Sequence, residues 1–373
     1  MDSLSIQLDD LRQRGLYRSL REPTGVPLSS NDYLGLSRSP EITAALVDAL
    51  QEGVDHGSTG SRLLTGHRGR FDRLESDFAR WQNRPAALFF ATGYSANVGL
   101  LSSILGPDDV VVSDSLNHAS LIDGIRLGRA ERCIVPHLDI QAVEEAVRTP
   151  RTGQCYVVVE SVYSMDGDLA DLNRLNTLCA EHGAHLIVDE AHATGLFGPR
   201  GAGRITDLGI EDAIFASIHT CGKALGQSGA FICGSDALRQ TLINRARSFI
   251  YSTAPPPFLA AGLAKAIELV QADPERRQKP LRLAQQLRNR LKDSVSIGSS
   301  ESHIVPLIVH TANASIALAE MLRGLGWDVY PIRPPTVPEG ECRIRLVMNA
   351  SLEPHQIDKL ADDILTGCNE LEL

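Results

Sequence analysis

The sequence contains no long hydrophobic run and no surplus of basic residues. A helix that crosses a membrane needs about 20 consecutive apolar residues, and no run of that length is present. The stretch from Met1 to Leu20 is polar and carries acidic residues, unlike a secretory or transit peptide. The net charge of -10, without a basic stripe, argues against nucleic acid or an anionic membrane surface as a partner. We therefore expect a soluble, cytoplasmic protein that binds neither.

The seven cysteines are odd in number and widely scattered, and no two of them form a C-x-x-C pair. This pattern argues against a disulfide framework or a zinc knuckle, so we expect a reducing compartment and no bound metal. The sequence also lacks internal repeats and low-complexity tracts. Its 373 residues would fill two or three domains of about 150 residues each.

What the sequence does contain, between about Pro40 and Phe249, is a series of short apolar runs that alternate with helical patterns. The runs are Ala87–Ala91, Val110–Val112, Tyr156–Val159, His185–Val188, Phe215–Ile218 and Ala230–Ile232. Near-continuous apolar strands separated by helices predict an α/β fold, with a mainly parallel sheet covered by helices on both faces.

The prolines of the Tyr251–Pro257 stretch interrupt regular structure and indicate a domain junction nearby. Beyond it, the pattern predicts a small α+β domain. Its expected elements are a long helix, a strand near Ile304–Val309, a helix over Ser315–Leu325, strands near Asp328–Ile332 and Arg343–Val347, and a final helix from Pro354. We predict an N-terminal segment (1–40), a large domain (41–255) and a smaller C-terminal domain (256–373).

Polar residues directly follow five of the apolar runs, where open parallel sheets bind their ligands. In chain order they are Thr92, Gly93 and Tyr94; Asp114 and His118; Glu160 and Ser164; Asp189, Glu190 and His192; and His219, Thr220 and Lys223. The sequence therefore predicts a site at this edge of the sheet.

Asp189 and His192 lie three residues apart at one of these strand ends. A buried carboxylate needs a cationic partner to offset the loss of its hydration, and a protonated pyridine nitrogen would supply one. The alternative is an Asp–His pair that only caps the next helix.

Lys223 follows the next strand and is flanked by Gly222 and Gly226, which let backbone approach a ligand closely. In an apolar pocket a lysine becomes a nucleophilic amine that can form a Schiff base. An ordinary surface lysine is the alternative, but the position one strand after Asp189 favours the reactive amine.

Gly93 and Tyr94 open a helix, whose free N–H groups and dipole suit a phosphate. Ser164, Thr220 and the Tyr251-Ser252-Thr253 run would add hydroxyl groups to the same anion. His118 is either a structural histidine or a ring that lies over a planar cofactor.

Together these motifs resemble the α-oxoamine synthase family of fold-type I pyridoxal-phosphate (PLP) enzymes, from about Leu8 to the C-terminus. The segments that carry the resemblance are Ser30–Leu36 (SNDYLGL), Gly57–Glu75 (GSTGSRLLTGHRGRFDRLE), Ala91–Asn97 (ATGYSAN), Asp114–Ser120 (DSLNHAS), Glu160–Asp168 (ESVYSMDGD), Val188–Gly198 (VDEAHATGLFG) and His219–Gly226 (HTCGKALG).

The resemblance implies roles for individual residues. Lys223 would hold PLP, Asp189 would pair with the pyridine nitrogen, His192 would bond the phenolic oxygen and His118 would stack on the ring. The other implied cofactor contacts are Gly93, Tyr94, Ser164 and Thr220, with Thr253 reaching the phosphate of a neighbouring subunit in a homodimer. Asn31 and Arg345 would bind the amino-acid carboxylate, and Arg18 and Thr336 the acyl substrate.

Two details depart from the family pattern. His219-Thr220-Cys221 replaces the commoner small or aromatic residues before the lysine, and the segment from Arg21 to Ser29 is short. The short segment affects the expected entrance for the acyl group and therefore the assignment of Arg18.

The segment Ile332–Leu346 (IRPPTVPEGECRIRL) resembles the branch of the family that condenses L-alanine with a pimeloyl thioester and releases carbon dioxide, in biotin biosynthesis. The donor would be pimeloyl-CoA or pimeloyl-acyl carrier protein. In this chemistry the Lys223 amine removes the α-proton of alanine, while Asp189 keeps the pyridine nitrogen charged.

Other readings stay open at this point. Members of the family also join glycine to acetyl-CoA or serine to long acyl chains, and some relatives are inactive partner subunits. Asp189-Glu190-Ala191-His192 also matches the acidic box of ATP-driven helicases, but the companion phosphate loop is missing, because Gly222-Lys223 is followed by Ala224. A basic docking face for an acidic carrier protein would draw on Arg245, Arg247, Arg276 and Arg277.

Overall fold

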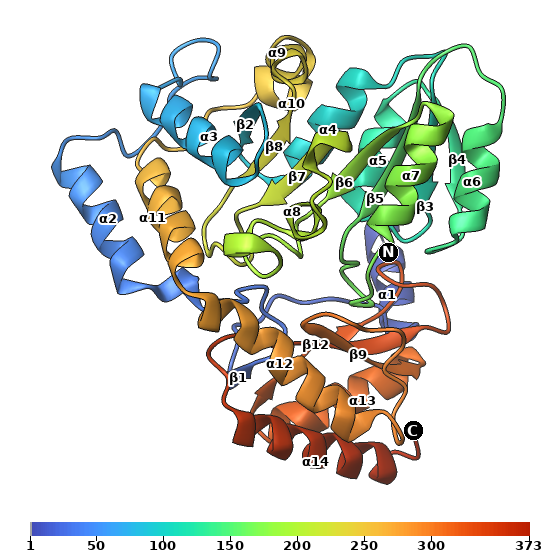
Figure 1. The fold of residues 1–373 in the computed structure, drawn as a ribbon. Helices are drawn as coiled ribbons and strands as arrows, with labels where there is room; N and C mark the ends of the chain where they lie inside the picture. Colours follow the sequence, from blue (N-terminus) through green and yellow to red (C-terminus); the bar gives the residue numbers. More distant parts are fainter. Residues whose placement is uncertain (1) are drawn as a thin grey trace. The chain divides into compact units, whose positions relative to one another are not determined.

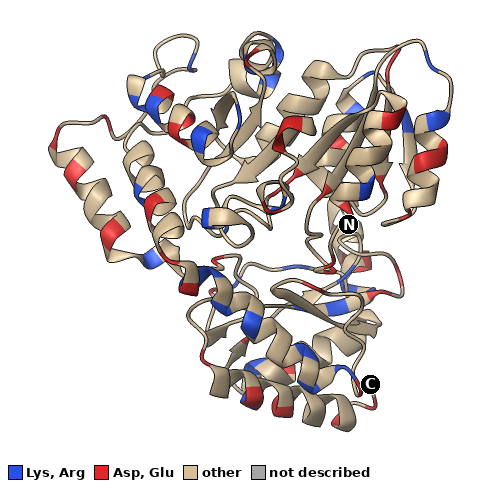
Figure 2. Cartoon of the chain, viewed as in Figure 1, with Lys and Arg blue, Asp and Glu red and all other residues tan. Residues whose placement is uncertain are grey.

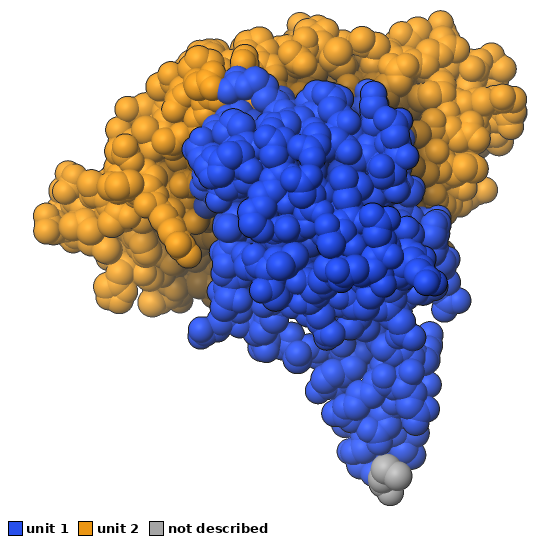
Figure 3. Space-filling model, turned by 90° about the horizontal axis from the view of Figure 1, so that it is seen from below, with its two compact units in different colours: residues 1–33, 164–168, 279–373 blue, residues 34–163, 169–278 orange. Residues whose placement is uncertain are grey.

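The computed structural model describes residues 2–373 and divides into two compact units (Figures 1 and 3). The smaller unit consists of the residues up to 33, residues 164–168 and residues 279–373, and the larger unit of residues 34–163 and 169–278. The domain borders that we predict at residues 40 and 255 stay predictions. Lysine and arginine residues alternate with acidic residues over the helices of both units (Figure 2).

The larger unit is built on a seven-stranded sheet. In sheet order its strands are β2 (Ala86–Phe90), β8 (Ala230–Gly234), β7 (Ile214–Thr220), β6 (His185–Asp189), β5 (Cys155–Glu160), β3 (Val110–Asp114) and β4 (Glu131–Val135). Strand β8 runs antiparallel to both of its neighbours, β2 and β7, and the other six strands all point in the same direction. The predicted mainly parallel sheet is confirmed.

Strand β4 was not predicted, and its position explains why. It lies at the edge of the sheet, and most of its side chains are exposed. Its sequence, ERCIV, therefore needs no apolar run, whereas β5 in the middle of the sheet is buried at all of its positions.

Helices cover both faces of the sheet, as predicted. The helices of the larger unit are α2 (Pro40–Gln51), α3 (Gly69–Trp81), α4 (Gly93–Ile104), α5 (Ala119–Leu127), α6 (Ile140–Arg148), α7 (Leu172–His182), α8 (Arg204–Leu208), α9 (Asp236–Arg245), α10 (Arg247–Ile250) and α11 (Leu259–Ala272). One apolar core joins the sheet to α4, α5, α9 and α10, and a second joins it to α6 and α7.

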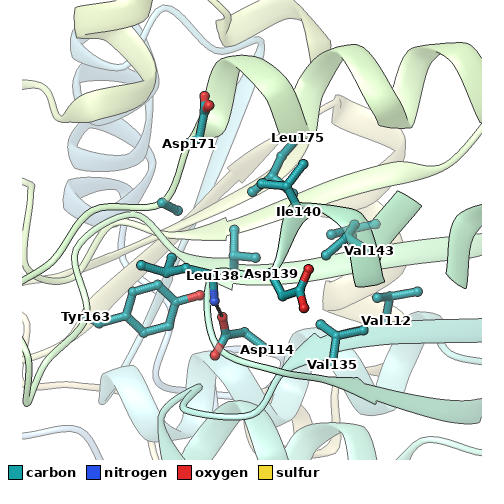
Figure 4. Close-up of a pocket in the computed structure, with 13 residues that line it drawn as sticks. Val112, Asp114, Val135, Leu138, Asp139, Ile140, Val143, Tyr163, Asp171 and Leu175 are labelled. Atoms are coloured by element: carbon teal, nitrogen blue, oxygen red, sulfur yellow. Dashed lines mark hydrogen bonds between the residues drawn. The ribbon is translucent and has the colours of Figure 1, made fainter. Parts of the chain in front are cut away.

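The second core encloses a small cavity of about 20 Å³ (Figure 4). That volume is roughly enough for one water molecule. Val112 and Val135 on the sheet and Val143 and Leu175 on the helices line it. Of the polar residues expected at the strand ends, Asp114 lines this cavity, but none of the residues with a predicted cofactor or substrate role does, so we interpret it as a packing defect and not as a substrate site.

The smaller unit combines a three-stranded antiparallel sheet with helices. Its elements are α1 (Ser3–Gln13), β1 (Val26–Pro27), most of α12 (Pro274–Leu291), β9 (Ile304–His310), α13 (Ala312–Gly324), β10 (Trp327–Asp328), β11 (Pro331–Ile332), β12 (Cys342–Val347) and α14 (Pro354–Glu370). The sheet order is β11-β12-β9, and β1 pairs with β10. The one long helix expected after Pro257 is two helices, α11 and α12, because Pro274 begins a new helix.

Side chains from α12, α13 and α14 pack on the small sheet and form its core. At the edge of this packing, Arg290 on α12 forms ion pairs with Asp358 (3.1 Å) and Asp362 (2.6 Å) on α14. Figure 2 shows basic residues along α12 and acidic residues along α14. In residues 2–373, no helix combines the length and the apolar character that crossing a bilayer would require.

A buried ion pair connects three elements of the larger unit. Glu75 on α3 pairs with Arg62 in the preceding loop, and both side chains are almost fully buried. Glu75 also accepts a hydrogen bond from the amide of Phe89 on β2 (2.9 Å) and pairs with Arg239 on α9 (3.3 Å). The buried charges of Arg62 and Glu75 therefore each offset the cost of removing the other from water.

We expect Glu75→Ala to lower the free energy of unfolding by about 3–5 kcal/mol, because Arg62 would stay buried without its counter-charge. Urea-induced unfolding followed by circular dichroism measures this loss. The control is Asp77→Ala on the same helix, which removes only an exposed ion pair with Arg80 and should cost less than about 1 kcal/mol. Similar losses for the two variants would contradict the prediction.

Candidate active site

The direction of the strands brings the predicted residues to one edge of the larger unit. Because β2, β3, β5, β6 and β7 are parallel, their carboxyl ends all lie at the same edge of the sheet. Gly93, His118, Glu160, Asp189 and Lys223 follow or end these five strands. The predicted gathering at the carboxyl edge agrees with this topology.

Lys223 lies in a tight loop directly after β7. The amide of Cys221 donates to the carbonyl of Gly229 (2.9 Å), and the amide of Gly226 donates to the carbonyl of Lys223 itself (2.9 Å). Gly226 has a φ of +62°, and a Cβ there would stand 2.4 Å from the backbone nitrogen of Ser37, so this corner of the loop requires glycine. Lys223 is half-buried, and its Nζ lies 3.0 Å from Nε2 of His192.

Asp189, the last residue of β6, has a buried carboxylate that the protein binds only through neutral donors. Its Oδ1 accepts a hydrogen bond from the amide of Ala191 (2.9 Å), and its Oδ2 accepts one from Nδ2 of Asn97 on α4 (2.8 Å). No cationic side chain of residues 2–373 forms an ion pair with it. A buried carboxylate in this state is suited to a cationic group on a bound molecule.

The first turn of α4 provides the candidate phosphate site. Thr92 caps the helix by accepting a hydrogen bond from the amide of Ser95 (3.0 Å). A Cβ on Gly93 would lie 2.6 Å from the methyl group of Thr220, so glycine allows the start of α4 to approach the end of β7. The backbone N–H groups of such a helix start attract anions. Gly93, Thr220 and the beginning of α4 therefore lie together, as predicted.

Three other predicted cofactor residues have different surroundings. Tyr94 is half-exposed, and its hydroxyl is hydrogen-bonded to the carboxylate of Asp123 on α5. Thr253 is exposed and forms no hydrogen bond with any residue in 2–373. Ser164 belongs to the smaller unit, where its carbonyl accepts a hydrogen bond from Nε of Arg345. The cofactor roles of these three residues stay predictions.

His118 is the N-cap residue of α5, and its ring is exposed. The ring nitrogen Nδ1 lies 2.7 Å from Oγ of Ser120 and accepts a hydrogen bond from the amide of Ser120 (3.2 Å). Protein packed around the base of the ring lowers the pKa of His118, as does the positive charge of Lys223, while Asp189 opposes the shift. The imidazole is therefore neutral at physiological pH.

Two buried glutamates flank Asp189 and carry raised pKa values. Burial raises the pKa of Glu160, at the end of β5, to about 8, and the negative charge of Asp189 on the neighbouring strand adds to the shift. Burial raises the pKa of Glu190 to about 7. One strand further along, burial lowers the pKa of His219 to about 3, assisted by the positive charge of Arg84.

In the smaller unit, Arg345 on β12 is buried together with Asn31. Its Nη1 donates to Oδ1 of Asn31 (3.1 Å), and its Nε donates to the carbonyl of Ser164. The remaining nitrogen, Nη2, is buried and has no hydrogen-bond partner in residues 2–373. This guanidinium therefore retains an unused donor and has no carboxylate partner, which suits an anionic ligand.

Arg18 and Arg333 form a second cationic group in the smaller unit. Nη2 of Arg18 donates to the carbonyls of Arg333 (3.3 Å) and Pro334 (3.0 Å), and Arg333 in turn donates to the carbonyls of Gly15 and Tyr17. Burial lowers the pKa of Arg333, and the positive charge of Arg18 adds to this. No carboxylate of residues 2–373 forms an ion pair with either arginine. Thr336 is exposed, and its amide donates to the carbonyl of Arg333 (3.1 Å).

The sequence reasoning gave no individual role to Asn97 or Ser120, although both end motif segments that it used. Asn97 lies one helical turn after Gly93, so the same helix start that points at the site also presents this amide. Ser120 follows His118 by two residues. Arg333 opens the segment Arg333–Pro338, from which we predict pimeloyl specificity, but its hydrogen bond with Arg18 spans 315 residues of sequence and could not be expected from local pattern.

Comparison with known proteins places this site in a family. The family described as aminotransferase class I and II matches residues 23–364. The chain belongs to this family. This membership excludes the helicase alternative, and the relatives below confirm the fold-type I resemblance.

Curated relatives match almost the whole chain. One named 8-amino-7-oxononanoate synthase, from Anaeromyxobacter dehalogenans, is 41% identical over 96% of this chain and 93% of its own length. Another of the same name, from Chlorobaculum parvum, is 42% identical over 94% of this chain and 91% of its own length. The α-oxoamine synthase resemblance is therefore confirmed.

Solved structures show the same fold. A serine palmitoyltransferase variant from S. paucimobilis, solved with bound PLP and myriocin, has a TM-score of 0.91 and 27% identity, with coverage of 100% of this chain and 98% of that one. The 8-amino-7-oxononanoate synthase of Francisella tularensis has a TM-score of 0.82 and 25% identity, covering 94% and 99%. The predicted fold class and the PLP dependence of the family are confirmed.

The raised pKa of Glu160 predicts how its contribution to stability changes with pH. In the unfolded chain the carboxyl ionises near its ordinary value of 4.5, whereas in the folded protein it ionises near 8. Its stabilising contribution is therefore fully present below pH 4.5 and is lost as the pH rises to about 8. Glu160→Gln cannot ionise, so the variant should gain stability relative to the parent protein across this range.

Urea unfolding of the cofactor-free proteins at several pH values between 4.5 and 8 measures this difference. The control is Glu41→Gln. Glu41 is exposed at the start of α2, and its pKa is lowered by its hydrogen bond with Ser39. Its contribution is lost as the pH falls, which is the opposite direction. A pH-independent difference between Glu160→Gln and the parent would show that Glu160 ionises normally in the fold.

Proposed function

We propose that this chain condenses L-alanine with a pimeloyl thioester and forms 8-amino-7-oxononanoate, carbon dioxide and the free thiol carrier, in biotin biosynthesis. The observation that carries this proposal is the full-length similarity, at about 40% identity, to relatives named 8-amino-7-oxononanoate synthase. The buried carboxylate of Asp189 and the adjacent Lys223–His192 pair provide the machinery that such an activity needs.

The residues of the larger unit fit PLP. Lys223 would hold the cofactor, and Asp189, which forms no ion pair within residues 2–373, would bind the pyridine nitrogen. His192 would bond the phenolic oxygen, and the ring of His118 would lie against the cofactor. The start of α4 with Gly93 and Tyr94, and the hydroxyl of Thr220, would bind the phosphate. When bound, PLP accepts the electron pair released at the α-carbon of the amino acid.

Lys223 is the base of the proposed reaction. Its Nζ would accept the α-proton of bound alanine and would later return a proton to the same carbon. His192, 3.0 Å away, holds Nζ in place through a hydrogen bond. Asn97 and the amide of Ala191 donate to the two oxygens of Asp189 and so fix the carboxylate that would bind the pyridine nitrogen.

Arg345 and Asn31 would bind the carboxylate of alanine. The buried Nη2 of Arg345 is an unused, charged donor, and Nη1 is held by Asn31 at 3.1 Å, so the guanidinium plane is fixed before substrate binds. A fixed guanidinium binds a carboxylate through charge-assisted hydrogen bonds. The carboxylate bound in this way is the group that leaves as carbon dioxide.

Arg18, Thr336 and Arg333 would select the acyl group. Two guanidinium groups that have no carboxylate partner suit the terminal carboxylate of a pimeloyl chain. A fatty acyl chain carries no such charge, and an acetyl group has no second carboxylate that could bind to these two arginines. Whether coenzyme A or acyl carrier protein delivers the chain is left to the assay below. A homodimer in which Thr253 completes the neighbouring phosphate site, and a cytoplasmic location, belong to the same proposal.

The assignment of Lys223 is tested by chemical trapping. Borohydride treatment of the holoenzyme should fix PLP to a single peptide that contains Lys223, which mass spectrometry of a tryptic digest identifies. Lys223→Ala should retain no such adduct, whereas Lys265→Ala, which removes an exposed ion pair with Glu268 on α11, should be labelled like the parent. Labelling of any other lysine in the parent would refute the assignment.

Substrate choice is tested by steady-state kinetics with alanine or glycine and with acetyl, pimeloyl and palmitoyl thioesters of CoA and of acyl carrier protein. We expect alanine and a pimeloyl thioester to give the highest kcat/KM. Arg333→Met should raise the KM for the pimeloyl thioester about tenfold or more, because a charge-assisted hydrogen bond is lost, and should leave any weak activity with a palmitoyl thioester unchanged.

The control for this variant is Arg14→Ala. The side chain of Arg14 is exposed and pairs with Asp10 on α1. An equal rise in KM for both thioesters would show that Arg333 only holds the N-terminal segment. Preference for glycine and acetyl-CoA would overturn the proposed substrate pair altogether.

A further inference from the structure

A chain of buried hydrogen bonds connects Asp189 to His118. Nδ2 of Asn97 lies 2.8 Å from Oδ2 of Asp189 and 2.9 Å from Oγ of Ser120. Oγ of Ser120 in turn lies 2.7 Å from Nδ1 of His118. Asn97, Ser120 and Asp189 are all buried, with 2%, 1% and 4% of their surface exposed, so water does not compete for these bonds.

The donor and acceptor roles along this chain follow from chemistry. An ionised Asp189 can only accept, so Asn97 must present its NH₂ group to it. The second hydrogen of that NH₂ group is donated to Oγ of Ser120, whose own hydrogen is then available for Nδ1 of His118. The backbone N–H of Ser120 points at the same nitrogen (3.2 Å) and can only donate. Nδ1 therefore accepts two hydrogen bonds and cannot carry a proton.

We propose that Asn97 and Ser120 are positioning residues that hold the imidazole of His118 neutral, with its only proton on Nε2. The hydrogen bonds alone determine where the proton of His118 lies. What this proton does in the reaction rests on the proposed function. Nε2 forms no hydrogen bond with any residue in 2–373, and the ring is exposed, so its N–H is available to a bound molecule. His118 is thereby a hydrogen-bond donor to an oxygen of the substrates, and Lys223 remains the base.

The same series of hydrogen bonds connects Asp189 at one end of the site with His118 at the other. Any proton on Nδ1 would face the hydroxyl and the amide of Ser120, and both of these donors would lose their acceptor. The charged groups around His118 act in opposite directions, since Lys223 disfavours and Asp189 favours a second proton. Glu160 accepts a hydrogen bond from the backbone N–H of His118 (2.6 Å) and fixes the backbone from which the ring extends. The residues that orient Asp189 toward the cofactor thus also set the proton position of His118.

The proton position is measured by nitrogen NMR of the holoenzyme that contains histidine labelled with ¹⁵N in the ring. The His118 signals are assigned by their absence in His118→Asn. In the parent protein we expect Nε2 to carry the proton completely, whereas free neutral histidine is a mixture of both forms. Detection of a proton on Nδ1 of His118 would overturn the proposal, and this measurement needs no substrate, because the parent protein itself carries the signal and His118→Asn serves only to assign it.

The role of Ser120 is tested by Ser120→Ala, with Ser115→Ala as the matched control. Ser115 is exposed, lies in the loop that leads into α5, and its hydroxyl forms no hydrogen bond with any residue in 2–373. Ser120→Ala removes one of the two donors to Nδ1, so the pKa of His118 measured by NMR titration should rise toward that of free histidine, and Ser115→Ala should leave it unchanged. An unchanged titration of His118 in Ser120→Ala would overturn the assignment of Ser120.

Kinetics separate this role from substrate binding. Ser120→Ala should lower kcat about three- to tenfold, which corresponds to one lost hydrogen bond, with little change in the KM for alanine. A change confined to KM would show that Ser120 acts on binding and would contradict the positioning role. If the enzyme proves to use other substrates, the NMR results still decide the proton position, so failure of the proposed function and failure of this inference are distinguishable.

Discussion

The buried carboxylate of Asp189 is the constraint on which the site depends. A carboxylate that is 4% exposed loses most of its hydration, and two neutral donors replace only part of it. Among residues 2–373 no side chain forms an ion pair with it, although the interior contains fully paired charges elsewhere, such as Arg62 with Glu75. A buried carboxylate that is compensated only by neutral donors is suited to a cationic group, and the neighbouring strand ends place Glu160 and Lys223 beside it.

The sheet topology explains how distant segments meet at this carboxylate. Asp189 ends β6, and its neighbours in the sheet are β5, which ends in Glu160, and β7, which leads to Lys223. The antiparallel strand β8 separates β7 from β2, yet keeps β2 parallel to β7. The start of α4 therefore emerges at the same edge as Thr220, and glycine at position 93 lets the two approach. Because β8 is the one reversed strand between them, β2 and β7 end at the same edge of the sheet, and the candidate phosphate site at the start of α4 lies at the same edge as Lys223.

The sequence predicted what depends on local pattern and missed what depends on long-range pairing. Apolar runs located the buried strands, and the residues after them located Asp189, His192 and Lys223. The exposed edge strand β4 has no such run and was missed. The bond between Asn97 and Asp189 joins positions 92 residues apart, and only the fold brings them together. Residues 164–168 likewise group with the smaller unit, although the neighbouring positions on both sides belong to the larger one. The composition of the sequence does not change at these borders, so they could not be predicted from it.

Arg343 and Arg345 show that two neighbouring buried charges can differ in how the fold compensates them. They are two positions apart on β12, so their side chains leave the strand on the same face, and both are buried. Arg343 is paired with the carboxylates of Asp166 and Glu341, which neutralise it within the fold. Among residues 2–373, Arg345 has only carbonyl and amide oxygens as partners, and its buried Nη2 has no hydrogen-bond partner. A guanidinium surrounded only by neutral oxygens keeps its full positive charge, so this position on β12 is suited to an anion in a way that the neighbouring position is not.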